Sequence, residues 1–236
     1  MLIGFMLFIV LLILVGVILS LTVLFPINNI TAKGSSKYTA EQIISSSGIK
    51  TGDNLFISSV KTDDLREKLP YVESVKVNRT LPDCITITVK DAVPYACYYS
   101  DGMYYTVSKL GYVLEALEEK PDSLFEIRAS GIKCSLGKAV KFTSEKTEDL
   151  IYEIVGYAED YGLSLGYVDV TDELAITAKA ENRFIVNFGT SNFLSNKFAH
   201  LSSMIKNIEE TKTGKINLSM WTTENTEGTF VAGDIE

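Results

Sequence analysis

The residues that could carry out chemistry are few and scattered along the chain. There is one histidine, His200, and there are three cysteines, Cys84, Cys97 and Cys134. The cysteines show no Cys-x-x-Cys spacing, so they are most simply small buried hydrophobic residues, with a Cys84–Cys97 disulfide as the alternative. His200 lies on an expected helix beside apolar residues, where a lone histidine is usually solvated or hydrogen-bonded.

Carboxylates are plentiful, with 30 Asp and Glu in the chain. They scatter along expected exposed faces, as in Glu115-x-x-Glu118-Glu119, and Gly52-Asp53-Asn54 offers a single carboxylate, far short of a hard-cation site. No Gly-x-Ser-x-Gly elbow or phosphate-binding glycine loop is present. We therefore predict no catalytic residue, metal or cofactor. A glycosidase-type pair of acids, which leaves little local signature, stays open as the alternative.

The N-terminal segment contains no charge. The first 32 residues lack any charged side chain, and residues 1–25 form a nearly unbroken apolar run. A helix of this length, at ~1.5 Å per residue, exceeds the ~30 Å hydrocarbon core of a bilayer. The run is too long for a signal peptide and lacks a cleavage site. We predict that residues 1–25 are a transmembrane anchor in the lipid bilayer.

The orientation follows less directly. Lys33 and Lys37 alone favour a cytoplasmic body, but large domains cross a membrane largely regardless of such charges. We therefore predict a single-pass protein of the cell membrane with an extracytoplasmic C-terminal body. The formal net charge of −8 argues against nucleic acid as a partner. Nothing in the motifs predicts a small-molecule substrate.

Residues 26–91 have the pattern β-α-α-β-β. Ile27, Ile30 and Ala32 are inward positions of a first strand, and Thr39 with Gln42 forms a capping box that opens a helix ending at Gly48. Leu55 and Phe56 are expected in the core. A second helix carries Val60, Leu65 and Leu69 and stops at Pro70. Two strands follow, with alternating apolar residues over 75–77 and 85–89.

Residues 92–222 are predicted to form a mostly antiparallel β domain with two helices, which makes the whole chain α+β. Asp101-Gly102 is a favoured hairpin turn. Helices are expected over 145–161 and from Leu194 for about four turns, and strands over 167–170, 174–177, 184–188 and 215–221. Residues 223–236 are predicted to be a flexible tail.

The first of these modules resembles a POTRA domain, and more narrowly that of FtsQ/DivIB-type bacterial cell-division proteins. The residues that carry this resemblance are Phe25-x-Ile27-x-x-Ile30-x-Ala32-x-Gly34, Gly48-Ile49-x-x-Gly52-x-Asn54-Leu55-Phe56 and Leu69-Pro70-Tyr71-Val72-x-x-Val75-x-Val77-x-Arg79-x-Leu81-Pro82-x-x-Ile85-x-Ile87-x-Val89. Asp91-Ala92 departs from the Glu-Arg that is frequent in the family.

The second module resembles the β domain of the same family. The matching segments are Asp101-Gly102-x-Tyr104-Tyr105-x-Val107-Ser108-x-x-Gly111-x-Val113-Leu114, Val186-Asn187-Phe188-Gly189, Lys197-Phe198-x-x-Leu201 and Gly214-Lys215-Ile216-Asn217-Leu218. Ser108 and Asn217 stand where the family commonly has Asp, and Phe188 where Leu is usual.

The resemblance implies a non-enzymatic divisome scaffold at the division septum, whose terminal β region docks the FtsB/DivIC–FtsL pair. Independently, a last strand over 215–221 would offer free N–H and C=O groups to an added partner strand, with the preceding helix as a wall. The predicted partner-binding residues are Phe198, Leu201, Ile216, Asn217, Leu218, Ser219, Met220 and Trp221. Two questions stay open. One is which set of alternating strand residues faces the partner, and the other is whether Trp221 anchors the partner or belongs to the domain core. The alternatives are an anchored cell-wall hydrolase and a POTRA protein of a secretion system.

Overall fold

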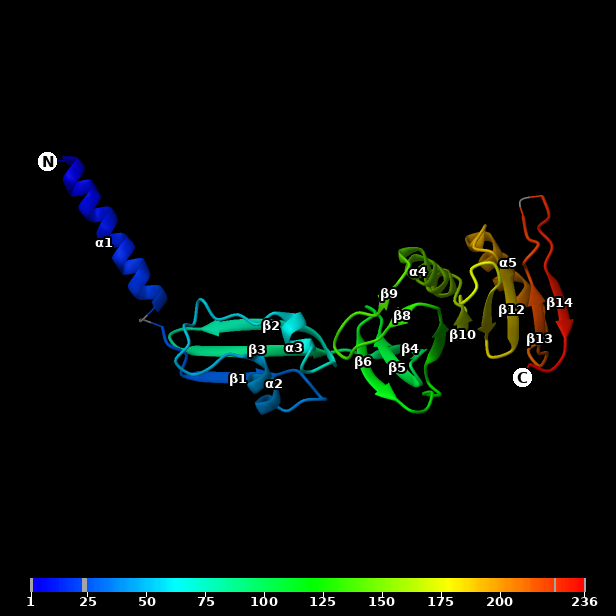
Figure 1. Ribbon diagram of the computed structural model, residues 1–236, viewed down its shortest axis with the longest axis horizontal. Coiled ribbons are helices and arrows are strands. Elements are labelled where there is room, and N and C mark those ends of the chain that lie inside the picture. Colours follow the sequence, from blue (N-terminus) through cyan, green and yellow to red (C-terminus); the bar gives the residue numbers. More distant parts are fainter. Residues whose placement is uncertain (1, 23–24, 223, 236) are drawn as a thin grey trace. The chain divides into compact units, whose positions relative to one another are not determined.

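The computed structural model describes residues 2–22, 25–222 and 224–235 (Figure 1). The chain divides into two compact units, Met1–Val93 and Pro94–Glu236. The predicted domain boundary, between residues 91 and 92, lies two residues before this division. Each unit contains its own sheet and its own hydrophobic core.

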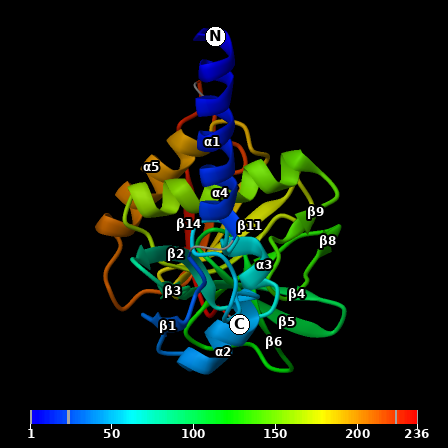
Figure 2. The ribbon, with the colours of Figure 1, turned by 90° about the vertical axis from the view of Figure 1, so that its left-hand side faces the viewer.

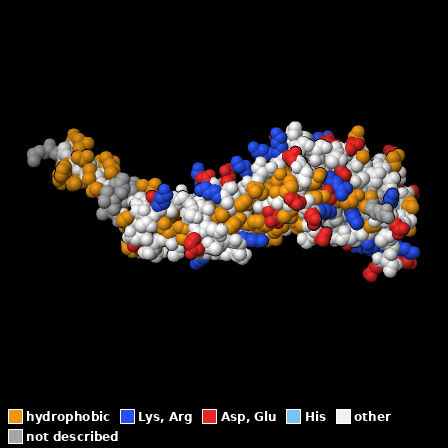
Figure 3. Space-filling model, turned by 60° about the horizontal axis from the view of Figure 1, so that its bottom comes forward, with side chains coloured by type: hydrophobic (Ala, Val, Ile, Leu, Met, Phe, Trp, Pro, Cys, Tyr) orange, Lys and Arg blue, Asp and Glu red, His pale blue; other side chains and the backbone are white. Residues whose placement is uncertain are grey.

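Helix α1 (Leu2–Thr22) opens the chain. Its apolar side chains between Ile3 and Leu19 are exposed, and Figure 3 shows them without a charged neighbour on the helix. Among the residues that the structure describes, no helix is long and apolar enough to cross a membrane. The anchor predicted over 1–25, of which residues 1, 23 and 24 lie outside the described residues, therefore stays a prediction.

The first unit has the predicted order β-α-α-β-β. Its elements are β1 (Asn29–Lys33), α2 (Ala40–Ser47), α3 (Thr62–Arg66), β2 (Val72–Thr80) and β3 (Cys84–Asp91). The sheet order is β1-β3-β2, with β1 parallel and β2 antiparallel to β3. The core contains Ile27, Ile43, Leu55, Leu65, Val72, Ile85 and Ile87.

Local chemistry sets the ends of α2. The Thr39 side chain accepts from the Gln42 N–H, the Gln42 side chain accepts from the Thr39 N–H, and Gly48 follows with φ 79°. These contacts satisfy N–H groups that have no partner inside the helix. Three details of the prediction are wrong. Val60 precedes α3 and Leu69 follows its end at Arg66, and Phe56 is 47% exposed.

The second unit is built on a nine-stranded sheet of order β14-β13-β12-β11-β10-β7-β4-β5-β6. Its strands are β4 (Pro94–Ser100), β5 (Met103–Ser108), β6 (Val113–Leu117), β7 (Phe125–Arg128), β10 (Leu165–Asp169), β11 (Ile176–Ala180), β12 (Phe184–Gly189), β13 (Gly214–Asn217) and β14 (Thr229–Ala232). The pairs β4–β7, β7–β10 and β12–β13 are parallel, and the other pairs are antiparallel. A separate pair, β8 (Ile132–Lys133) and β9 (Lys141–Phe142), is antiparallel.

Helices α4 (Glu145–Asp160) and α5 (Leu194–Asn207) cover one face of this sheet (Figures 1 and 2). Their apolar stripes and the inward residues of the strands form a single core. Phe188 of β12 stacks on Phe198 of α5, with ring centroids 4.7 Å apart. The opposite face of the sheet is not covered by any described helix.

The structure corrects the prediction at the end of the chain. The predicted strand 215–221 is shorter, ending at Asn217, and the predicted flexible tail, 223–236, contains β14. Residues 223 and 236 of that tail lie outside the described residues. The strand was missed because Thr229-Phe230-Val231-Ala232 is a short segment among polar residues and is ordered by its pairing with β13.

The cysteines of the described chain are all free thiols, so the Cys84–Cys97 disulfide is not formed. Cys97 is fully buried on β4. Burial raises the pKa of the Cys97 thiol to about 11, which keeps it protonated and unreactive near neutral pH.

Candidate functional site

The predicted partner-binding residues fall into two groups. Phe198, Leu201, Ile216 and Leu218 are each at most 1% exposed and belong to the core, and Trp221 is 8% exposed. Asn217 and Met220 are exposed, and Ser219 is half-buried. The buried group cannot touch a partner without unfolding the domain. These buried residues support the surface by packing in the core beneath it.

Strand β13 is not the edge of the sheet. It pairs with β12 on one side and with β14 on the other, and Leu218 N–H donates to the Asn187 carbonyl at 2.8 Å. The prediction that residues 215–221 form the free edge is therefore wrong. The edge lies one strand further along, on β14, which has no second neighbour among the described strands.

The hydrogen-bond alternation shows which groups of β14 are free. Gly233 N–H donates to the Thr213 carbonyl at 3.1 Å, so Gly233 and Thr213 form a hydrogen-bonded pair that continues the β13–β14 ladder. Because antiparallel pairs alternate, Thr229 and Val231 also bond inward. The N–H and C=O groups of Phe230 and Ala232 then point away from the sheet, as donors and acceptors respectively for one more strand.

The composition of β14 differs from that of the other edge strands in the two larger sheets. Strand β2 carries Glu73, Lys76 and Arg79, strand β1 ends in Lys33, and β6 contains Glu115. Strand β14 is Thr-Phe-Val-Ala and has no charged side chain. Charged residues on an edge strand discourage pairing with other chains. Strand β14 lacks this protection.

Exposed apolar side chains lie on and near this part of the sheet. Val231 is 66% exposed and Met220 is 73% exposed. Phe193, at the start of α5, is 44% exposed and packs on Trp221 with ring centroids 5.8 Å apart. The buried Nε1 of Trp221 has no hydrogen-bond partner among the described residues. The exposed side chains of Val231, Met220 and Phe193 offer apolar contact at the surface, whereas the buried Trp221 donor is not accessible to a partner.

A buried lysine holds the turn that supports this surface. Lys197 is 1% exposed, and its ammonium donates to the carbonyls of Phe188 at 2.7 Å and Thr190 at 2.8 Å. Desolvation lowers its pKa from the ordinary 10.5. These bonds tie the start of α5 to the end of β12. Only the resemblance pointed to Lys197, because a lysine on an amphipathic helix normally faces water.

The described carboxyl groups whose pKa is perturbed are stabilised as anions. Burial would raise the pKa of Glu126, but hydrogen bonds and charges from Arg128 and Lys120 outweigh it and keep that pKa below its ordinary value. Each other described carboxyl with a perturbed pKa is shifted the same way. A glycosidase acid needs the opposite shift. Within the same residues, no cluster of His, Cys, Asp and Glu could hold a metal ion.

Comparison with known proteins gives a consistent set of similarities. Residues 25–91 match the model of the POTRA domain, FtsQ-type. Cell division protein DivIB of Clostridium botulinum strain Hall is 29% identical over 213 residues, which cover 83% of this chain and 78% of that protein. DivIB of Clostridium acetobutylicum is 27% identical and covers 77% and 74%. Cell division protein FtsQ of Corynebacterium glutamicum is 32% identical over 87 residues, 36% of this chain and 39% of that protein.

Proposed function

We propose that this chain is a divisome scaffold that captures a partner strand on β14. It carries an FtsQ-type POTRA domain, is similar to a DivIB cell-division protein over 83% of its length and is similar to an FtsQ protein over 36% of it. The observation that carries the proposal is an unpaired, uncharged edge strand at the end of a large sheet. The partner chemistry is an extended segment of an FtsB/DivIC-type protein that associates with an FtsL-type protein.

Strand addition fits the groups that β14 presents. The outward N–H and C=O groups of Phe230 and Ala232 supply main-chain bonds, which give affinity without regard to sequence. The exposed side chains of Val231 and Met220 supply apolar contacts, which favour particular partner residues. The rigid sheet behind β14 positions these groups before binding, so little ordering cost is added.

Membrane tethering would assist this weak, edge-based recognition. The first 32 residues lack charge, and we propose that the segment 1–25 anchors the chain in the cell membrane with both units outside the cytoplasm. Confinement of both partners to one membrane raises their effective concentration. A contact that is weak in solution is then well populated at the division septum.

A single substitution at the edge tests the proposal. Ala232→Pro removes an outward N–H and leaves the inward bonds of Thr229 and Val231 in place. Loss of a bond that becomes buried costs about 1–3 kcal/mol, so co-purification of the DivIC-type partner should fall about fivefold or more. The matched control is Ala232→Gly, which keeps the N–H and should retain the partner.

A second pair of variants guards against misfolding. Val231→Lys places a charge on the exposed edge and should weaken capture, whereas Val231→Thr keeps a β-branched neutral side chain and should not. Thermal unfolding of all four variants checks that the fold persists. Undiminished co-purification with both Ala232→Pro and Val231→Lys would contradict strand addition at β14.

The alternative, an anchored cell-wall hydrolase, is less well supported. The lowered pKa of Glu126 and of the other shifted carboxyls leaves these groups ionised, and a general acid must hold its proton near neutral pH. Turnover of cell-wall polymer by the purified chain, abolished by one Glu or Asp substitution, would favour the enzyme.

A further inference from the structure

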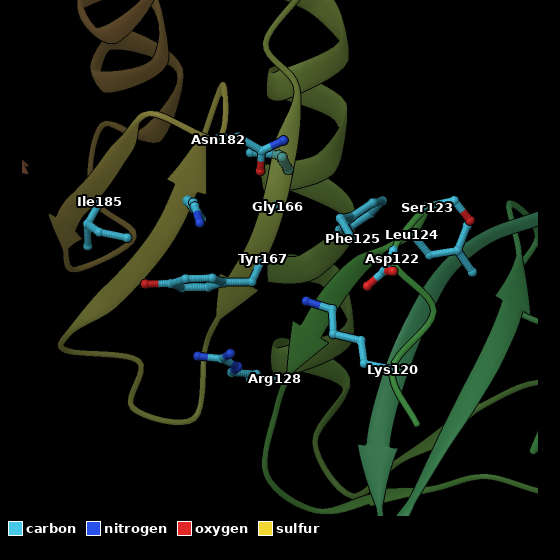
Figure 4. Close-up of a pocket in the computed structure, with 12 residues that line it drawn as sticks. Lys120, Asp122, Ser123, Leu124, Phe125, Arg128, Gly166, Tyr167, Asn182 and Ile185 are labelled. Carbon is cyan, nitrogen blue, oxygen red and sulfur yellow. The ribbon is translucent and has the colours of Figure 1, made fainter. Parts of the chain in front are cut away.

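The uncovered face of the nine-stranded sheet contains a polar cavity of about 470 Å³. Figure 4 shows its two sides. Strands β10, β11 and β12 contribute Tyr167, Lys179 and Ile185, and the segment from Lys120 to Phe125, which leads into β7, forms the facing wall. The cavity lies on the interior strands of the sheet, separated from β14 by β13.

Cations converge on this cavity although the chain as a whole is acidic. Lys120, Arg128 and Lys179 line it, and Asp122 is the one carboxylate among the lining residues. Beside it lies Glu126, whose side chain is 8% exposed. The protein has 30 acidic and 22 basic residues, whereas in the lining of this cavity three cations outnumber one carboxylate.

Only part of this positive charge is used internally. Glu126 accepts from Arg128 Nε and Nη2, both at 3.0 Å, and lies 3.3 Å from the Lys120 ammonium. The Arg128 guanidinium is held over the Tyr167 ring, 4.3 Å from its centroid. Asp169 also lies near Arg128, but its Oδ1 accepts from the N–H and hydroxyl of Thr171. The guanidinium is therefore fixed in place before any ligand arrives.

The remaining donors are available to a ligand. Within the described residues, neither Nη1 of Arg128 nor the ammonium of Lys179 has a hydrogen-bond or ion-pair partner. A side chain at Gly166 would approach Asn182 Oδ1 at 3.0 Å and the Lys179 stem at 3.3 Å, so the glycine keeps the floor open. In the described part of the chain, the Arg128 guanidinium, fixed by Glu126 but with Nη1 still free, and the unpaired ammonium of Lys179 are charged donors that a carboxylate can accept from.

We propose that this cavity binds an acidic peptide segment of a partner protein, with a Glu or Asp side chain placed between Arg128 and Lys179. Charge complementarity selects the carboxylate. The cavity has the size of a ligand site rather than that of a single small anion, and the apolar side chains of Leu124, Leu165 and Ile185 around it contact the aliphatic parts of a peptide. This site is separate from the β14 edge and does not depend on it.

The test measures binding of a short fluorescein-labelled peptide in which Glu alternates with Ala to the full-length chain in detergent, by fluorescence anisotropy. Lys179→Met removes a charged donor that has no internal partner, so affinity should fall about tenfold. Asp122→Asn removes the opposing carboxylate and should raise affinity. Lys206→Met, at an exposed lysine in the last turn of α5 on the opposite face of the sheet, is the matched control and should leave affinity unchanged.

Two outcomes overturn the proposal. Equal affinity for the Glu peptide in the wild type and in Lys179→Met and Asp122→Asn would mean that the cavity is not the site. Inorganic phosphate that displaces the peptide at the concentration at which the peptide itself binds would assign the cavity to small anions. A matched peptide with Gln in place of Glu should not bind. None of these measurements depends on partner capture at β14, so the two proposals fail separately.

Discussion

The edge strands β2 and β14 end their sheets in opposite ways. Strand β2 carries Glu73, Lys76 and Arg79 over nine residues. The guanidinium of Arg79 reaches back to the carbonyls of Leu55 at 2.7 Å and Ser58 at 2.6 Å. Charged side chains that are held by their own domain make an edge unattractive to another strand.

Strand β14 has none of these devices. Its four residues are uncharged, and Val231 is 66% exposed. Glycine at position 214 lets it lie against β13, because a Cβ there would overlap the Val231 carbonyl oxygen. In the first unit, the charged side chains of edge strand β2 disfavour pairing with another chain, whereas edge strand β14 of the second unit has no charge that opposes pairing. The predictions below test whether the core, the supporting turn and the first unit behave as this contrast requires.

The largest effect is expected in the core that supports β14. Phe198→Ala removes a fully buried ring that stacks on Phe188, which should destabilise the second unit by about 3–5 kcal/mol. Denaturant unfolding should show this loss while the first unit unfolds as before. Lost partner capture at unchanged stability would instead mean that Phe198 contacts the partner directly.

The next largest effect is expected at the turn below the edge. Lys197→Met leaves the carbonyls of Phe188 and Thr190 without their donor, and each buried unsatisfied group costs about 1–3 kcal/mol. We expect a loss of about 2–3 kcal/mol. Lys197→Arg keeps the positive charge but changes the shape of the side chain, so it serves as the comparison variant. Unchanged stability of Lys197→Met would contradict the role assigned to Lys197.

Lys197 also predicts a pH dependence with a definite sign. Its pKa is lowered in the folded state from the ordinary 10.5, so the unfolded chain holds the proton more tightly. The unfolding free energy of the wild type, relative to Lys197→Met, should therefore rise as pH increases from the lowered folded pKa toward 10.5. Urea unfolding at several alkaline pH values measures this difference.

The stability of the first unit should depend on pH in the acidic range instead. The Asp91 carboxylate accepts from the Ser35 hydroxyl, from the Ser36 N–H and hydroxyl, and from the Lys37 N–H. Burial opposes these bonds, but together they lower its pKa from 3.8. The stabilisation is present above 3.8 and is lost as pH falls from there through the lowered folded pKa.

Asp91→Asn tests that statement in the first unit. Because the carboxylate is partly exposed, we expect a loss of about 1–2 kcal/mol at neutral pH and a weaker acid dependence than in the wild type. The second unit should keep its unfolding midpoint. Equal destabilisation of both units would contradict their description as separate cores.

The smallest effect is a gain. Gly156 lies inside α4, and a Cβ there meets nothing within 4 Å, so Gly156→Ala should stabilise the second unit by about 0.5–1 kcal/mol. The matched control is Gly111→Ala, where φ is 76° and the Cβ would lie 2.9 Å from the Tyr152 hydroxyl. Thermal unfolding should rank the two variants on opposite sides of the wild type.

The sequence predicted the elements whose signals are local. The capping box at Thr39, the Asp101-Gly102 turn and the stripe of α5 each depend on residues a few positions apart, and each is present. The edge could not be predicted in the same way. Strand β14 exists because residues 229–232 pair with residues 214–217, and no short-range pattern marks that pairing.

The cavity also had no local signal. Lys179 is far from Lys120 and Arg128 in sequence and lines the same cavity only because β10 places β11 close to β7 in the sheet. Burial of Lys197 was hidden for a related reason. A lysine on an amphipathic helix is expected to face solvent, but in the fold Lys197 lies next to the Phe188 carbonyl, which accepts a hydrogen bond from its ammonium.

Amide hydrogen exchange with and without the soluble segment of a DivIC-type partner tests strand addition most directly. The outward amides of Phe230 and Ala232 should exchange freely in the isolated chain and become protected in the complex, while the inward amides of β14 change little. Protection elsewhere, with the amides of Phe230 and Ala232 still exchanging freely, would contradict capture of the partner on β14.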